Sequence, residues 1–191
     1  MKKFDLHIHT NASDGICTPE QAVFAAKAAG LYGIAITDHD SIKGLPSAKK
    51  AAKEAGIALI PGIEVTTHMG DIIVLGVEEK ISGTPSQVFD KAHRLGGIVI
   101  VAHPFVGFYQ TSLAGMLGII RDKIDAIEVY NANTSMAANI KAMEAAKRYK
   151  ITGIASSDSH MADTIGSAFT ACNGNDIIKA IKEGKVEIGW L

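Results

Sequence analysis

Several features that mark whole classes of protein are missing from this sequence. It has only two cysteines, Cys17 and Cys172, which lie far apart and form no CxxC pair. A reduced protein is therefore a better interpretation than a disulfide between them. The first residues, MKKFDLHIHT, include no apolar segment typical of a signal peptide, and the longest apolar runs have only the length of a core strand. We expect a cytoplasmic protein that does not cross a membrane.

An excess of one charge is missing as well. The chain has 19 Lys and Arg against 20 Asp and Glu, for a formal net charge of −1. This balance offers no basic stripe for tight binding of nucleic acid through its phosphates. The sequence also contains neither GxGxxG nor GxxxxGK[ST]. The usual phosphate-cradling loops of nucleotide-binding folds are therefore absent.

What the sequence does contain is a regular alternation of strand and helix patterns. Apolar strand segments and helical segments alternate about seven times, which predicts an α/β fold with a parallel sheet and crossover helices. Thr18 and Thr84, each followed by proline, predict helix starts. No helix fits between Val65 and Asp71, so a hairpin is expected there. The length, without linker or low-complexity segment, indicates one domain over residues 1–191.

The stretch DLHIHT, residues 5–10, predicts the start of a metal site. Apolar and polar residues alternate in it, which is typical of a β-strand. Residues two apart on a strand point to the same face, so His7 and His9 project together. Two neutral imidazoles aimed at one point are two potential ligands of one metal ion.

Further polar residues fall at or near the carboxyl ends of the expected strands. They are His7, His9, Asp38, His39, Glu64, His103, Glu128, Asp158 and His160. In a (β/α) barrel these ends meet at one mouth, where active sites are built. One such histidine alone is more often a capping or core residue. So many imidazoles and carboxylates together instead indicate divalent cations, because the carboxylates would otherwise repel one another.

Mixed imidazole and carboxylate ligands suit Zn, Mn or Fe, with Mg as a further candidate. The number of candidate ligands exceeds what one tetrahedral ion needs. We therefore expect two or three divalent ions, with a carboxylate such as Glu64 as a bridge.

The motifs DLHIHT, ITDHD, PGIEV, AHP and SDSH occur in this order along nearly the full length of the chain. With them, the chain resembles the PHP (polymerase and histidinol phosphatase) family. The resemblance implies a distorted seven-stranded (β/α) barrel, similar to a TIM barrel, and a single PHP-type catalytic domain over residues 1–191. It also implies a trinuclear metal site.

The resemblance further implies how ligands are shared among the ions. The first ion would take His7, His9, Glu64 and Asp158, the second Glu64 and His103, and the third Asp14, His39 and His160. Many relatives have a histidine where this chain has Ile73, so the second ion is expected to have fewer ligands or lower occupancy. His68 is a candidate replacement, although a solvated loop histidine is the better interpretation. Asp14 is histidine in some relatives, which would change the metal preference.

Our hypothesis is a metal-dependent phosphoesterase in which a metal-activated water attacks a small phosphomonoester or nucleotide. The residues proposed as catalytic are Glu64, as the bridging ligand, and His160, as the acid for the leaving oxygen if it is not a metal ligand. A second metal-bound water is the alternative acid.

Three other functions stay open. A phosphodiesterase or 3′-5′ exonuclease on oligonucleotides would use the same metals, although the near-neutral charge makes nucleic acid a candidate only as a short substrate. A non-catalytic metal-bound module is the second, and Ile73 is the only hint in its favour. A metal-dependent amidohydrolase is the third, but no lysine lies at a strand end to serve as a bridging carbamate.

The substrate-binding residues are less marked in the sequence. Lys43 and Asn131 are candidates for binding a phosphate, and each has an alternative as a solvated or a helix-capping residue. Phe105, Phe108 and Tyr109 follow His103 and are candidates for a lid that stacks on a ring, with core packing as the equal alternative.

Overall fold

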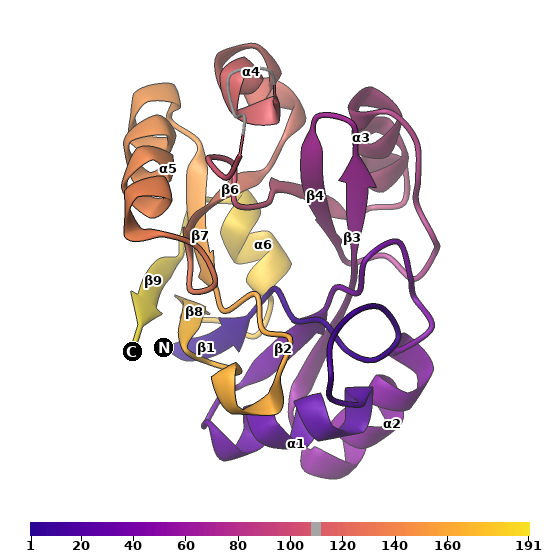
Figure 1. Cartoon of the computed structure of the whole chain (residues 1–191). Helices are drawn as coiled ribbons and strands as arrows, with labels where there is room; N and C mark the ends of the chain where they lie inside the picture. Colours follow the sequence, from indigo (N-terminus) through magenta and orange to yellow (C-terminus); the bar gives the residue numbers. More distant parts are fainter. Residues whose placement is uncertain (108–111) are drawn as a thin grey trace.

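The computed structural model describes residues 1–107 and 112–191 (Figure 1). Its strands are β1 (Lys2–Asp5), β2 (Gly33–Ile36), β3 (Ala58–Thr67), β4 (Gly70–Leu75), β5 (Ile98–Val101), β6 (Ala126–Asn131), β7 (Thr152–Ser156), β8 (Ala168–Cys172) and β9 (Glu187–Trp190). Its α-helices are α1 (Pro19–Ala28), α2 (Leu45–Ala55), α3 (Pro85–Arg94), α4 (Leu113–Ile120), α5 (Met136–Tyr149) and α6 (Ile177–Lys182). Two short 3₁₀ helices, Arg121–Lys123 and Ala162–Thr164, complete the elements described.

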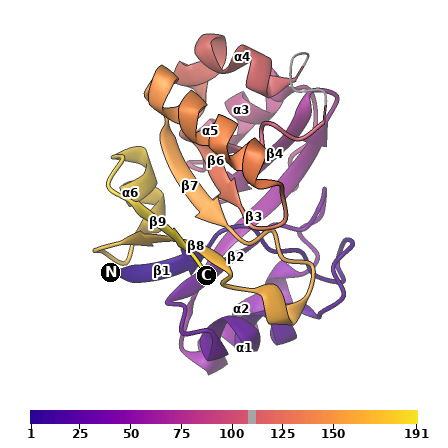
Figure 2. The same ribbon diagram turned by 60° about the vertical axis from the view of Figure 1, so that its left-hand side comes forward.

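All the described strands belong to one curved sheet with the order β7-β6-β5-β4-β3-β2-β1-β8-β9. The sheet nearly closes on itself, because the Thr170 hydroxyl of β8 donates to the Ala155 carbonyl of β7 at 2.8 Å and accepts from the Ala155 N–H at 3.0 Å. The α/β barrel predicted from the sequence is thereby confirmed. Figure 2 shows β7, β8 and β1 following one another around this closing side.

Two details of the predicted barrel are wrong. The sheet has nine described strands rather than seven. It is also mixed rather than parallel, since β4 is antiparallel to both of its neighbours and β8 is antiparallel to β1 and β9. The hairpin expected between β3 and β4 is confirmed, and it is the reason for the reversal, because a tight turn can join only antiparallel strands.

The helix starts follow the signals read from the sequence. At α1 the Thr18 hydroxyl accepts from the Gln21 N–H, and the Gln21 side chain accepts from the Thr18 N–H, which makes a reciprocal capping box. Thr84 and Gln87 repeat this arrangement at α3. At the carboxyl end of α2, Gly56 adopts a φ of 71°, a left-handed conformation that glycine permits at low cost.

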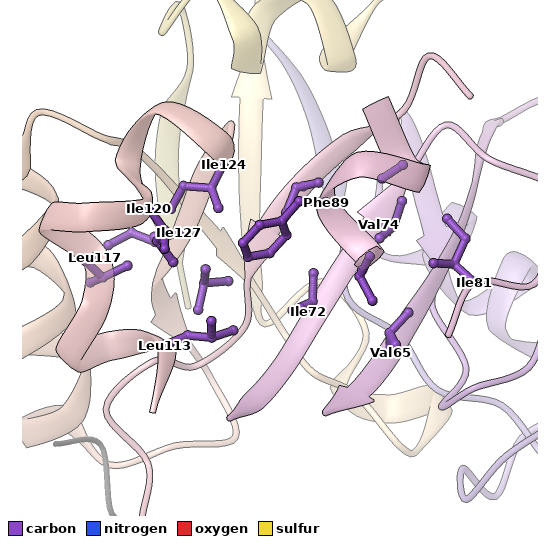
Figure 3. Close-up of a cluster of buried hydrophobic side chains, with 14 of the residues drawn as sticks. Val65, Ile72, Val74, Ile81, Phe89, Leu113, Leu117, Ile120, Ile124 and Ile127 are labelled. Carbon is purple, nitrogen blue, oxygen red and sulfur yellow. The ribbon is translucent and has the colours of Figure 1, made fainter. Parts of the chain in front are cut away.

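Two apolar layers cover the outside of the barrel. Figure 3 shows the layer beneath α3 and α4, where Phe89 and Leu117 pack against strand residues such as Ile72, Val74 and Ile127. A second layer lies between the first strands and helices α1 and α2, and it includes Ile34, Ile36 and Ala48. Each helix therefore buries one face against the sheet, as expected for crossover connections.

A third cluster fills the barrel interior, and we call it the barrel floor. It consists of Phe4, Leu6, Ala35, Ile60, Ile73, Leu75, Ile98, Ile100, Ala102, Ala126, Ile154, Cys172, Ile177 and Ile181. Every strand from β1 to β8 contributes to it, and α6 adds Ile177 and Ile181. The interior is therefore a packed core and not a channel.

Strands β1, β2, β3, β5, β6 and β7 run in the same direction, so their carboxyl ends meet at one edge, which we call the mouth. Isolated bridges join Ile8 to Ser159, both beyond strand ends, and His39 to Glu64, which lies within β3. These bridges hold the loops of the mouth together. The amino end of β4 lies at the same edge, because that strand runs the other way.

Among the helices of the described residues, none combines the length and the apolar character that crossing a bilayer requires.

Candidate metal centre

The eight side chains predicted as metal ligands come together at the mouth, although they come from segments spread between residues 7 and 160. Within the described residues they form overlapping groups whose ligand atoms lie within 4.8 Å of one another. The groups are His7, His9 and Glu64; His7, His103 and Asp158; His9, Asp14, His39 and His160; and Glu64, Asp71 and His103.

Glu64 lies at the centre of these groups. Its Oε2 atom is 3.1 Å from His7 Nε2, 3.1 Å from His9 Nε2 and 3.3 Å from His39 Nδ1. Its Oε1 atom is 3.2 Å from His103 Nε2. One fully buried carboxylate therefore faces four imidazoles, which is the arrangement expected of a bridging ligand.

His7 is held from behind by a second carboxylate. Its Nδ1 lies 3.0 Å from Glu128 Oε1, while its Nε2 faces Glu64 and Asp158. The other Glu128 oxygen accepts from the His103 backbone N–H at 2.8 Å and from the Asn131 amide at 2.9 Å. Such a carboxylate fixes the imidazole so that the hydrogen is on Nδ1 and the lone pair of Nε2 points to a metal.

Asp14, His39 and His160 form the more exposed part of the centre. Asp14 Oδ2 is 3.3 Å from His160 Nε2 and 3.9 Å from His39 Nε2. His160 Nδ1 lies 3.1 Å from the Asp158 carbonyl, so Nδ1 carries the hydrogen and Nε2 keeps a lone pair toward Asp14. This tautomer suits a metal ligand.

His9 lies between the inner and the outer part. Its ring stacks on His39 and on His160, with ring centres 4.5 Å and 4.3 Å away. Its Nδ1 is the one buried side-chain nitrogen or oxygen among the described residues that has no hydrogen-bond partner, and it faces Asp14 Oδ1 at 3.7 Å. A buried nitrogen without a partner is costly, and a cation beside it would satisfy it.

Two of the ligand positions have an unusual backbone. His103 has a φ of 24° and Asp158 a φ of 52°, in a region that residues other than glycine rarely adopt. Such a conformation costs about 1–3 kcal/mol and persists where the surroundings impose it, typically at functional sites. Each residue comes two positions after the last residue of its strand, β5 or β7, and its side chain belongs to the candidate ligand groups.

The charges of the centre shift its pKa values strongly. Burial alone would lower the pKa of His7, but the charges of Glu64, Asp158 and Glu128 outweigh it and raise that pKa well above its usual value. Burial also opposes the charged form of His103, yet its bond to Glu64 and the charge of Glu128 raise its pKa to about 9. Burial would raise the pKa of Glu64, but His7 and His103 lower it well below its usual value.

These residues fit divalent cations. The donor set combines imidazole nitrogens with carboxylate oxygens, which suits first-row divalent metals. Without cations, the imidazoles must take up protons to balance the buried carboxylates, as the raised pKa values of His7 and His103 indicate. Metal ions replace those protons, so binding of metal and binding of protons compete at this site.

The structure explains what stands at the position of the missing histidine. Ile73 pairs directly with Glu64 across the β3–β4 hairpin, and its side chain is fully buried in the barrel floor. His68 lies exposed near the hairpin turn and belongs to none of the described ligand groups. Asp71, two residues before Ile73, is grouped with Glu64 and His103. The expectation that ligands lie at the carboxyl ends of strands did not include Asp71, because β4 brings its amino end to the mouth.

Glu128 was recognised at a strand end but not assigned a role by the sequence, and its place behind His7 needs the structure. Of the predicted substrate residues, Lys43 is exposed in the loop between β2 and α2. Asn131 is fully buried, and its amide donates to Glu128 and to Asp158 at 2.9 and 3.1 Å. Of the predicted lid, Phe105 packs beside the core, whereas Phe108 and Tyr109 lie outside the described residues.

A cavity of about 370 Å³ opens beside the centre. Asp158 and His160 form part of its wall, and the remaining described lining residues are Tyr130, Ala132, Asn133, Ser157, Met161, Thr164, Ser167 and Leu191. Its volume lies in the range of pockets that hold small-molecule ligands.

Comparison with known proteins places this geometry in a family. The PHP domain model matches residues 5–101, half of the chain, and the PHP-associated model matches residues 137–186. An uncharacterised protein of Methanocaldococcus jannaschii is 34% identical over 145 residues, which are 68% of this chain and 82% of that protein.

Relatives with an assigned activity match over shorter stretches. A 5′-3′ exoribonuclease of Haemophilus influenzae is 49% identical over 67 residues, 35% of this chain and 24% of that protein. A 3′,5′-nucleoside bisphosphate phosphatase of Chromobacterium violaceum is 38% identical over 82 residues, 41% of this chain and 29% of that protein. The matched stretch is thus under a third of either enzyme.

A solved structure has the same fold over the whole chain. It is a two-domain protein from Bacteroides vulgatus, described as containing a predicted PHP-like metal-dependent phosphoesterase, with a TM-score of 0.84 and 20% identity. The superposition covers 99% of this chain and 64% of that protein. The barrel, the predicted ligands at its mouth and the match to the PHP model over half of the sequence agree, and the chain belongs to the PHP domain family.

Proposed function

We propose that this chain is a metal-dependent phosphoesterase that hydrolyses a small phosphomonoester or nucleotide. The observation that carries the proposal is the fully buried Glu64 carboxylate, with four imidazoles within 3.3 Å of its oxygens. The proposed ligands are spread along the chain from His7 to His160, so nearly the full length is needed to bring them together. We therefore propose that residues 1–191 act as a single catalytic domain.

The proposed ligands are those that the resemblance to the PHP family implies. His7, His9, Glu64 and Asp158 would hold a first ion, Glu64 and His103 a second, and Asp14, His39 and His160 a third. All eight belong to the groups described above, and Asp158 Oδ1 lies 3.4 Å from His7 Nε2 and 3.2 Å from His9 Nε2. Two or three ions of Zn, Mn or Fe, with Mg as a further candidate, suit this mixed donor set. Glu64 contributes to more than one group, which supports its assignment as the bridge.

Divalent cations bound at such a site lower the pKa of water to near neutrality and neutralise the charge of a phosphoryl group. The protein's own residues supply position. Glu128 orients His7 through Nδ1, and Asn131 donates to both Glu128 and Asp158. We therefore infer a positioning role for Asn131 and keep Lys43, which is exposed beside the mouth, as the candidate for phosphate binding. His160 lines the cavity, so it is the candidate acid for the leaving oxygen as long as it is not a ligand of the third ion.

A phosphatase is favoured over a phosphodiesterase by the charge of the cavity. No lysine or arginine is among the described residues that line it. A protein that binds a longer nucleic acid needs several such contacts to phosphates. The phosphodiesterase or exonuclease stays the second candidate, since the Haemophilus influenzae relative is an exoribonuclease.

The test is metal analysis of the purified protein, combined with phosphate release from a panel of phosphomonoesters and short oligonucleotides in added Mn²⁺. We expect two or three ions per chain and release of phosphate from a monoester. Cleavage of oligonucleotides alone would establish the second candidate. Protein that binds no Mn²⁺, Zn²⁺ or Fe²⁺ and stays inactive would contradict the proposal.

A further inference from the structure

Asp71 occupies an inward position of β4 at the mouth of the barrel. It precedes Ile73 by two residues, so both side chains project from the same face of the strand. Ile73 pairs directly with Glu64, and Asp71 is therefore the next inward position of β4 toward the mouth. Its carbonyl accepts from the Ala102 N–H at 3.1 Å, which brings it beside the strand end that carries His103.

We propose that Asp71 is a ligand of the second metal ion, together with Glu64 and His103. The proposal rests on the metal centre of the proposed function and extends it to a residue outside the predicted ligand set. Ligand atoms of these three side chains lie within 4.8 Å of one another, close enough to share one cation. Asp71 thus compensates for the aliphatic side chain of Ile73, and the second ion keeps three protein ligands.

The surroundings of Asp71 also favour a cation. The Asp71 side chain is half-buried, and its carboxylate lies close to that of the fully buried Glu64. Two carboxylates this close are unfavourable unless a positive charge lies between them. A cavity of about 120 Å³ borders both Asp71 and His103, and such a volume accommodates several water molecules beside the ion.

This ligand set has a consequence for metal preference. A carboxylate in place of an imidazole gives the second site two oxygen donors and one nitrogen donor. Oxygen-rich sets suit Mn²⁺ and Mg²⁺, whereas imidazole-rich sets suit Zn²⁺. We therefore expect the wild-type second site to prefer Mn²⁺, and Asp71→His, which restores an imidazole at the position that faces Glu64 and His103, to shift this preference toward Zn²⁺.

The experiment compares Asp71→Asn with the wild-type protein and with Asp90→Asn, the same substitution at an exposed residue of α3. Metal-free proteins are titrated with Mn²⁺, bound metal is counted, and the spin coupling of neighbouring Mn²⁺ ions is followed by EPR. Asp71→Asn should lose one ion per chain or bind it at least ~10-fold more weakly. It should also lose a coupled Mn²⁺ signal, while Asp90→Asn behaves as wild type.

The thermal unfolding of each metal-free variant checks the fold. Asp71→Asn that unfolds like wild type and still binds every ion with unchanged affinity overturns the assignment of Asp71, even where the wild-type protein hydrolyses phosphomonoesters. Wild-type protein that binds no metal overturns the proposed function itself. Should Asp71→Asn unfold early, Asp71→Glu decides, because a retained carboxylate should retain the ion.

Discussion

The barrel floor and the mouth are built from the same strands, yet they differ in almost every physical property. The floor contains only apolar side chains, which pack without charge. The mouth brings imidazoles and carboxylates within 3.1–3.4 Å of one another. On β4 the change takes two residues, since Ile73 belongs to the floor and Asp71 faces the ligands. A single strand therefore contributes to both regions through two successive inward-facing residues.

The floor and the mouth also differ in their effect on stability. Each side chain of the floor removes apolar surface from water, worth about 25 cal/mol per Å². The mouth instead buries charged groups and holds His103 and Asp158 in a strained backbone conformation. We infer that the floor and the outer layers maintain the mouth, and that metal ions offset part of its cost. Changes in the two regions should therefore have separable effects.

The largest expected effect is at the mouth. Glu64→Gln keeps the size of the side chain and removes the charge that faces four imidazoles. Hydrolysis should fall about 1,000-fold or more, because a divalent centre supplies several kcal/mol of stabilisation to the transition state. Phosphate release and metal content measure the loss. The exposed Glu144→Gln is the control, and near-normal turnover by Glu64→Gln with full metal content would contradict the bridging role.

The second effect is at the floor. Ile100 is fully buried, and Ile100→Ala should lower the free energy of unfolding by about 2–5 kcal/mol through lost burial and a new cavity. Urea unfolding measures this change. The folded variant should bind as many metal ions as wild type, because Ile100 is not among the ligand groups. A loss of metal in fully folded Ile100→Ala would show that the two regions are coupled, and the exposed Ile119→Ala serves as the control.

Much of the fold and of the ligand set at the mouth could be predicted from the sequence, for physical reasons. Local signals act over a few residues, so the capping box at Thr18 and the β3–β4 hairpin were both predicted. The position of the ligands after parallel strands follows from the barrel rule, which needs only the order of strands. The nine-stranded count and the antiparallel β8 were missed, because pairing between distant strands leaves no local pattern.

The roles of Asp71 and Glu128 lay outside sequence reasoning for different reasons. Asp71 is at the beginning of its strand, and only the antiparallel direction of β4 brings it to the mouth. Glu128 follows the strand-end pattern, but whether a carboxylate contacts a metal or supports an imidazole depends on distances of a few ångströms. The 3.0 Å contact between Glu128 Oε1 and His7 Nδ1 indicates that Glu128 supports the imidazole.

Glu128→Gln should also affect the mouth, but less strongly than Glu64→Gln does. The Glu128 carboxylate accepts from His7, Ser156, His103 and Asn131. A glutamine amide nitrogen cannot accept, so about half of these bonds are lost. Removal of such a supporting carboxylate typically costs 10–100-fold in metal affinity or activity, about 1.4–2.7 kcal/mol. Metal titration and phosphate release measure it, and an unchanged affinity would exclude the supporting role.

The most gradual expected effect is the dependence of stability on pH, and its sign should reverse with metal. The pKa of His103 rises from about 6.5 in the unfolded chain to about 9 in the folded one, and that of His7 also rises. Each raised pKa contributes stability that is fully present below pH 6.5 and is lost as the pH rises through the folded value. Metal-free protein should therefore lose stability between about pH 6.5 and 9, while Glu64 stays ionised throughout.

Metal reverses this trend because an imidazole must lose its proton before it binds an ion, so rising pH strengthens binding and with it the folded state. Midpoints of thermal unfolding in EDTA and in saturating Zn²⁺, measured between pH 6.5 and 8.5, should diverge as the pH rises. Ile100→Ala should shift both curves downward and keep their slopes, since Ile100 is apolar and is not among the ligand groups. Parallel curves with and without metal would mean that protons and metal ions do not compete at the mouth.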